Sequence, residues 1–187
     1  MLSSTAKYDN SFQRFKRVHE LICRSPRFKH VPAIVTEEIE AFPEAVAYIK
    51  SETLAGRMTP QLHGLRHIDY GKLPQAEVVE HLIESRRWFS GVLGYHPSIW
   101  YTPWGANQPH LHAAAVSLGM EAVDCSTSFK LKGRYGVPQL MRDGKKLDYF
   151  AGKAIIIHWW NALDVERLEL LVEASAGPSE HETSTNN

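Results

Sequence analysis

Short apolar segments alternate with amphipathic helical patterns along most of this chain, and this alternation constrains the fold more than any other feature. Residues 31–36 and 98–102 are rich in β-branched and aromatic side chains, as buried strands are. From Pro43, and again after Pro74, apolar residues recur at the spacing of a helix with one buried face. Strand–helix alternation of this kind predicts an α/β fold with a parallel sheet or barrel.

The same pattern extends toward both ends of the chain. A helix is predicted from Phe12, with Ser11 as its N-cap. The remaining predicted elements are strands at 57–62, 121–125 and 154–158 and helices at 111–118 and 165–172. Residues 176–187 contain almost no apolar side chain and are predicted to be disordered. Residues 1–175 are predicted to form a single domain.

Composition narrows the class of protein. The 187 residues carry 21 Lys and Arg against 21 Asp and Glu, which leaves no excess basic charge for nucleic acid. There is no apolar run of about 18 residues, as a membrane span would need. The N-terminal residues also lack the basic and apolar regions of a signal peptide. We therefore expect a cytoplasmic protein with no nucleic-acid or membrane partner; its oligomeric state is open.

Two histidines four residues apart, His63 and His67, follow the strand predicted at 57–62. At the mouth of a strand, two imidazoles can share one divalent metal ion. The helical zinc-protease motif is set aside because it needs a glutamate where this chain has Gly64, a poor residue for a helix interior. The plainer alternative is a pair of polar histidines on a surface loop.

Two further predicted strands end in segments rich in side chains that bind ligands. Residues 101–107 follow one strand, and residues 158–161 follow another. In α/β folds, ligands bind beyond the carboxyl ends of parallel strands. The plainer alternatives are a tight turn with a packed indole at Trp104 and a core histidine at His158.

Taken in order, these segments resemble the polysaccharide deacetylases, also called NodB-homology or carbohydrate esterase family four proteins. The resemblance covers roughly residues 31 to 173. In that family both histidines of H-x-x-x-H bind a divalent metal, usually zinc, and His63 and His67 match them. His158 matches the histidine that acts as the catalytic acid. The resemblance implies a distorted (β/α) barrel.

A second motif of the family shapes one wall of the substrate groove. The family pattern R-x-P-[YF]-G is matched here by Tyr-Thr-Pro-Trp-Gly. The substrate-binding residues implied by the resemblance, together with the indole that follows His158, are Tyr101, Pro103, Trp104, Gly105 and Trp159. Flat indole rings can stack on the apolar faces of pyranose rings, although core packing explains many tryptophans equally well.

The chain departs from the family at its carboxylates. The family's first strand carries two adjacent aspartates, a general base and a metal ligand, whereas this chain has no Asp-Asp pair. Asp9 is the one nominee for both roles, although no apolar strand precedes it. The motif arginine is replaced by Tyr101. Either the N-terminal strand is missing from this chain or the site has lost its carboxylates. Asp69 is a candidate to orient an imidazole, or else an ordinary turn residue.

The function implied by the resemblance is a metal-dependent hydrolase that removes acetyl groups from an N- or O-acetylated carbohydrate. Metal-activated water would attack the acetyl group, and zinc is the expected ion. Two alternatives stay open. One is a degenerate, noncatalytic glycan-binding or scaffold protein on the same barrel. The other is a hydrolase of a non-sugar C–N bond, because one fold can host several chemistries.

Overall fold

The computed structural model describes residues 4–26, 28–123, 129–130, 155–156 and 162–175. The side chains of residues 4–11 are not among those described. Contacts within the chain group Lys29–Thr127 into one unit, and Met1–Phe28 with Ser128–Asn187 into another.

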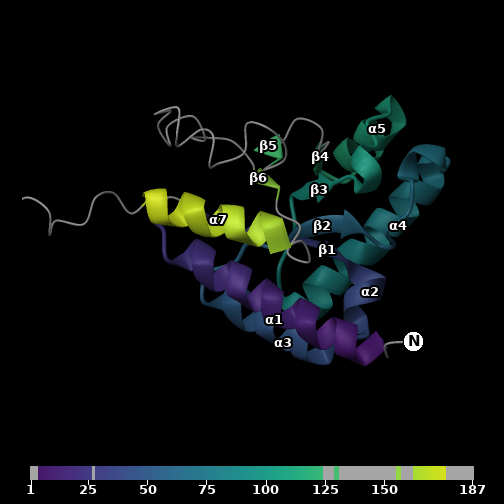
Figure 1. The fold of residues 1–187 in the computed structure, drawn as a ribbon. Helices are drawn as coiled ribbons and strands as arrows, with labels where there is room; N and C mark the ends of the chain where they lie inside the picture. Colours follow the sequence, from purple (N-terminus) through teal and green to yellow (C-terminus); the bar gives the residue numbers. More distant parts are fainter. Residues whose placement is uncertain (1–3, 27, 124–128, 131–154, 157–161, 176–187) are drawn as a thin grey trace, which may run out of the picture. The chain divides into compact units, whose positions relative to one another are not determined.

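The unit Lys29–Thr127 is built on a four-stranded sheet (Figure 1). Its strands are β1 (Ala33–Val35), β2 (Gln61–Gly64), β3 (Ile99–Tyr101) and β4 (Glu121–Val123). They lie side by side in the order β1-β2-β3-β4, and every neighbouring pair is parallel. Helices occupy the connections, as parallel strands require. The prediction of an α/β fold with a parallel sheet is confirmed.

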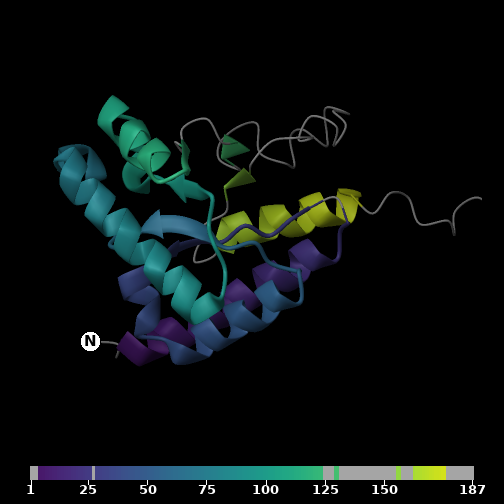
Figure 2. The same ribbon diagram turned by 180° about the vertical axis from the view of Figure 1, so that it is seen from behind.

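The helices of this unit are α2 (Thr36–Glu40), α3 (Pro43–Leu54), α4 (Gln75–Trp88) and α5 (Pro109–Ser117), with short helical turns η1 (Tyr70–Lys72), η2 (Phe89–Leu93) and η3 (Pro103–Gly105). The helices α4 and α5 pack side by side, and they contact β2 and β4 respectively (Figure 2). Gly119 adopts a φ of +67° just after α5, the left-handed position that commonly ends a helix. Within the described residues, no helix combines the length and apolar character needed to cross a membrane.

The core of this unit lies between the sheet and its helices. Leu62 of β2 and Trp100 of β3 are fully buried, as are Val78 and Leu82 on the predicted apolar stripe of α4. Burying one such side chain contributes about 1.5–3 kcal/mol relative to leaving it in water. These buried side chains form a packed platform under β2 and β3.

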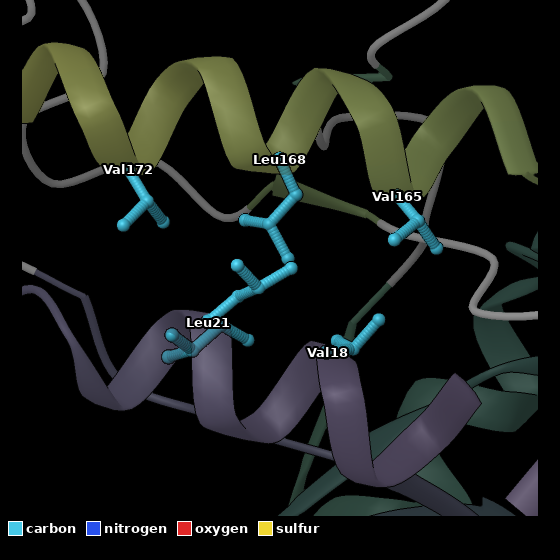
Figure 3. Packing of buried hydrophobic residues seen from close by; sticks show 6 residues of the cluster. Val18, Leu21, Val165, Leu168 and Val172 are labelled. Carbon is cyan, nitrogen blue, oxygen red and sulfur yellow. The ribbon is translucent and has the colours of Figure 1, made fainter. Parts of the chain in front are cut away.

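The second unit contains α1 (Ser4–Cys23), α7 (Ala162–Ser175) and a parallel pair of short strands, β5 (Phe129–Lys130) and β6 (Ile155–Ile156). The helices α1 and α7 lie side by side. A cluster of buried apolar side chains joins them (Figure 3), formed by Val18, Leu21, Ile22, Val165, Leu168 and Val172. Leu21 and Leu168 point toward one another across this interface.

Two sequence predictions differ from the structure at the N-terminal side. Ser11 is not an N-cap, because α1 already begins at Ser4. Asp9 accordingly lies within α1 rather than ahead of it. The apolar spacing that starts at Phe12 lies within α1, which begins eight residues earlier, at Ser4. Residues 31–36 were predicted to be one strand, but Thr36 begins α2.

The strand predicted at 57–62 is displaced toward the histidines. Met58 pairs with His30 only as an isolated bridge. Pro60 has no N–H to give to a sheet and separates this bridge from β2, which starts at Gln61. The strand β2 therefore contains His63. Single-domain organisation over 1–175 stays a prediction, and the predicted disordered tail lies outside the described residues.

Candidate functional site

His63 lies at an irregularity in the pairing of β1 with β2. The register runs from Ile34 opposite Leu62 to Val35 opposite Gly64, and it shifts between the two pairs. His63 is the extra residue of β2 in this pairing. Bulges of this kind re-aim side chains and are over-represented next to active sites. The half-buried His63 side chain is thus set at the carboxyl end of the sheet, where α/β folds bind ligands.

A hydrogen bond from β2 to β3 sets the protonation pattern of His63. Its Nδ1 atom lies 2.7 Å from the carbonyl oxygen of Tyr101. A carbonyl can only accept, so Nδ1 is the donor. A neutral imidazole protonated at Nδ1 carries its lone pair on Nε2. Histidines that bind metals commonly donate their other ring N–H in this way. The tautomer of His63 therefore fits a metal ligand.

His67 stands in the loop that follows β2, and its side chain is exposed. The ring centres of His63 and His67 are 5.0 Å apart, and their planes are inclined by 53°. Two imidazoles bound to one tetrahedral zinc, with Zn–N bonds of about 2.0–2.1 Å, have ring centres about 5 Å apart. The predicted pair is brought together at a spacing that fits one shared divalent ion.

The other predicted members of the metal and catalytic set are not described at side-chain level. Asp9 lies in α1, within the residues whose side chains are undescribed, and His158 lies outside the described residues. The predicted substrate-binding residue Trp159 also lies outside them. Among the side chains that the structure does describe, no group of three or more His, Cys, Asp and Glu is placed to hold a metal ion. From this part of the chain, His63 and His67 are the two ligand candidates.

Hydrogen bonds hold the loop between the two histidines on two sides. Arg66 donates two hydrogen bonds, of 2.6 and 2.7 Å, to the carboxylate of Glu37 on α2. The main-chain N–H of Glu37 donates to the carbonyl of Leu65 at 3.1 Å. The Arg66 guanidinium lowers the pKa of the Glu37 carboxyl. From the other side, the Tyr70 hydroxyl accepts hydrogen bonds from the loop backbone.

Trp104 projects beside the histidine pair. Its ring centre lies 5.2 Å from that of His67, and 72% of its surface is exposed. Trp104 has a φ of +60° and a ψ of +8°, and among the described residues it alone combines a side chain with a positive φ. That left-handed conformation costs roughly 1–2 kcal/mol. Strain of this kind clusters at ligand sites, so Trp104 is a candidate binding residue.

The turn that carries Trp104 is held by Thr102, which is buried. The Thr102 hydroxyl donates to the carbonyl of Ala106 at 2.7 Å, and its N–H donates to the carbonyl of Val123 at 3.1 Å. Pro103 is buried and Gly105 is half-buried with a φ of +68°. The predicted groove wall therefore begins at the last residue of β3, half-buried Tyr101, whose main-chain carbonyl contacts His63.

Asp69 makes the contacts of a turn residue. One carboxylate oxygen accepts from the N–H of Gly71 at 3.1 Å and caps η1. The other lies 3.1 Å from the ammonium group of Lys72. Neither contact is with an imidazole, and a role for Asp69 in orienting one stays a prediction.

Several residues that support the site were not predicted from the sequence, among them Tyr70 and Thr102. Both are buried, Tyr70 at the start of η1 and Thr102 directly after β3. Apolar periodicity does not reach such positions, because neighbouring residues there share no regular face. A large aromatic residue closely following H-x-x-x-H was the available signal for Tyr70.

A sequence profile of the polysaccharide deacetylase family matches residues 27–123, just over half of the chain. The chain therefore belongs to the polysaccharide deacetylase family. Among curated proteins, none matches this sequence.

Solved structures with similar folds come from the same group of proteins. A family 4 carbohydrate esterase from Streptomyces lividans, in complex with acetate, shares 16% identity at a TM-score of 0.64, over 88% of this chain and 82% of that one. The polysaccharide deacetylase Bc1974 from Bacillus cereus shares 15% identity at a TM-score of 0.62, over 86% of this chain and 80% of that one. A CE4 family pseudoenzyme from Bacillus anthracis shares 12% identity at a TM-score of 0.70, over 89% of this chain and 57% of that one. At these identities the likeness shows the fold, and the predicted fold class is confirmed.

Proposed function

We propose that this chain is a metal-dependent hydrolase that removes acetyl groups from an N- or O-acetylated carbohydrate. The observation that carries the proposal is the His63–His67 pair, with ring centres 5.0 Å apart at the carboxyl end of a parallel sheet. Membership of the polysaccharide deacetylase family supports the same class of reaction.

In this proposal His63 and His67 hold the metal, and zinc is the first candidate because neutral imidazoles suit it well. When bound, a divalent metal would polarise the acetyl carbonyl and lower the pKa of the attacking water toward about 7. The Tyr101 carbonyl keeps His63 in the ligating tautomer. Asp9 is proposed for one of two roles, either the third ligand or the base that takes the proton of water.

The remaining roles concern the leaving group and the sugar. His158 is proposed to give a proton to the departing amine, since an amide nitrogen cannot leave as an anion. The exposed indole of Trp104, 5.2 Å from His67, would stack on the apolar face of a pyranose ring next to the acetyl group. Tyr101, Pro103, Gly105 and Trp159 would complete that wall.

The test combines metal content with acetate release from a panel of acetylated glycans. His63→Ala should lose both the metal and acetate release. His158→Ala should keep the metal and lose about 10²–10⁴-fold in rate, the usual contribution of a general acid. His96→Ala replaces an exposed histidine outside the proposed machinery and serves as the matched control. A wild-type rate in His158→Ala would show that the acid is assigned wrongly.

Likeness to a CE4 family pseudoenzyme favours one second candidate, a noncatalytic glycan-binding or scaffold protein. Metal and glycan binding without acetate release would support that candidate over the enzyme. Adding small cyclic amides to the panel tests the remaining alternative, a hydrolase of a non-sugar C–N bond.

A further inference from the structure

One phenol oxygen lies under the loop that separates the two histidines. The Tyr70 hydroxyl accepts a hydrogen bond from the N–H of Leu65 at 2.9 Å and another from the N–H of Arg66 at 3.3 Å. Three residues separate His63 from His67, and two of them therefore donate to this one atom. Main-chain donors in an irregular loop need such an acceptor, because no sheet or helix supplies one.

The third intervening residue, Gly64, packs closely against the same phenol. Its φ is +112°, a region that residues with side chains rarely adopt. A Cβ atom at this position would lie 2.7 Å from the Tyr70 hydroxyl oxygen and 2.9 Å from a ring carbon of Tyr70. The backbone can approach the phenol closely only because position 64 has no side chain.

The phenol is itself held by the core. The Tyr70 side chain is fully buried, and its ring meets the rings of Trp100 and His81 edge-on, with centres 5.2 and 5.7 Å apart. Trp100 belongs to β3 and pairs with Leu62 of β2. Tyr70 thus joins the packed platform under the strands to the loop that presents His67.

We propose that Tyr70 is a positioning residue, which sets the spacing of His63 and His67 through its hydroxyl and thereby sets the affinity for a divalent metal. This inference rests on the proposed function, since it assumes that the two histidines bind the metal. Tyr70 touches neither the metal nor the substrate in this account. Gly64 is the complementary residue that lets the loop reach the hydroxyl.

The first test compares the zinc affinity of Tyr70→Phe with that of Tyr95→Phe, by calorimetry at a temperature where both variants are folded. Tyr95 is a half-buried tyrosine of the same unit, whose hydroxyl accepts from Gln61. We expect Tyr70→Phe to raise the Kd for Zn²⁺ by about 10–100-fold, as loss of groups that orient metal ligands commonly does. Tyr95→Phe should bind as the wild type does.

A second variant approaches the same contact from the other side and covers the case in which Tyr70→Phe fails to fold. Gly64→Ala should push the hydroxyl away and weaken zinc binding to a similar extent. Gly56→Ala is its control, because Gly56 also has a positive φ, +70°, but has open space around it. A double variant Gly64→Ala/Tyr70→Phe should be less impaired than the product of the two single effects, since both act on one contact.

Hydrogen exchange of the metal-free protein gives a readout that does not depend on zinc. The amides of Leu65 and Arg66 should exchange at least about tenfold faster in Tyr70→Phe than in the wild type. Their exchange rates should be unchanged in Tyr95→Phe. Zinc affinity in Tyr70→Phe and Gly64→Ala equal to that of their controls would overturn the inference while leaving the proposed function intact. A wild-type chain that binds no zinc would instead contradict the proposed function and the inference together.

Discussion

The Nδ1 atom of His63 lies 2.7 Å from the main-chain carbonyl oxygen of Tyr101, so that the end of β2 is hydrogen-bonded to the end of β3. This bond links the metal-ligand candidates to the segment that carries Trp104. It also couples the orientation of His63 to the backbone of its neighbouring strand.

Because the acceptor is a main-chain atom, changing the side chain of Tyr101 should leave the affinity for the metal nearly unchanged. We expect Tyr101→Phe to bind Zn²⁺ with an affinity within about threefold of the wild type, against the 10–100-fold loss typical when an orienting partner is removed. Zinc titration of the purified variant checks this. A large loss of affinity would mean that the tyrosine hydroxyl, and not the carbonyl, governs the site.

Replacing Trp104 should leave the stability of the fold unchanged or raise it, and should weaken glycan binding. Asparagine tolerates the left-handed conformation better than tryptophan, and the indole is 72% exposed, so little burial is lost. We expect Trp104→Asn to keep the free energy of unfolding or raise it by up to about 1 kcal/mol. The same variant should raise the KM for an acetylated glycan several-fold. Unchanged KM would remove Trp104 from the proposed sugar site.

The ion pair between Glu37 and Arg66 should give a small acid dependence of stability. Hydrogen bonding by Arg66 lowers the pKa of Glu37 from its ordinary 4.5. A carboxyl with a lowered pKa in the folded state stabilises the fold above its unfolded pKa, and that contribution is lost as the pH falls through the folded pKa. The side chains of Arg66 and Glu37 are 57% and 38% exposed, so solvent weakens the effect.

We therefore expect wild type to lose slightly more stability than Glu37→Gln when urea unfolding is compared at about pH 6 and about pH 3. The difference should shrink at high salt, which screens exposed pairs. Parallel losses in the two proteins at low salt would show that this pair does not contribute.

The interface of α1 with α7 should depend on Leu168. Its side chain is 2% exposed and faces Leu21. We expect Leu168→Ala to cost about 2–5 kcal/mol of unfolding free energy, as large-to-small core changes do. Leu170→Ala is the matched control on the same helix, because Leu170 is 43% exposed. Equal effects of the two variants in thermal unfolding would contradict this packing.

The parts of the fold that were predictable are those in which periodicity reflects burial. The apolar stripe of α4 predicted a helix after Pro74, and Val78 and Leu82 of that stripe are fully buried. Strand–helix alternation predicted the parallel sheet for the same reason. The spacing of His63 and His67 also identified two side chains that the structure brings together.

Features created by tertiary contacts were not predictable in this way. The position of Tyr70 soon after H-x-x-x-H is a weak signal, but its hydroxyl reaches the loop only because Trp100 of the sheet and His81 of α4 hold the ring, and these contacts cannot be deduced from the sequence. The bulge at His63 arises from the register between β1 and β2. The positive φ of Trp104 runs against its residue type, so sequence preference would predict a different conformation.

The most direct test of the account is the zinc content of purified wild type and of His63→Ala and His67→Ala, measured by mass spectrometry alongside acetate release. We expect stoichiometric zinc and acetate release in the wild type, and loss of both in either variant. A wild-type chain that binds no metal, or variants that retain stoichiometric zinc, would contradict the central claim that these two histidines form the metal site.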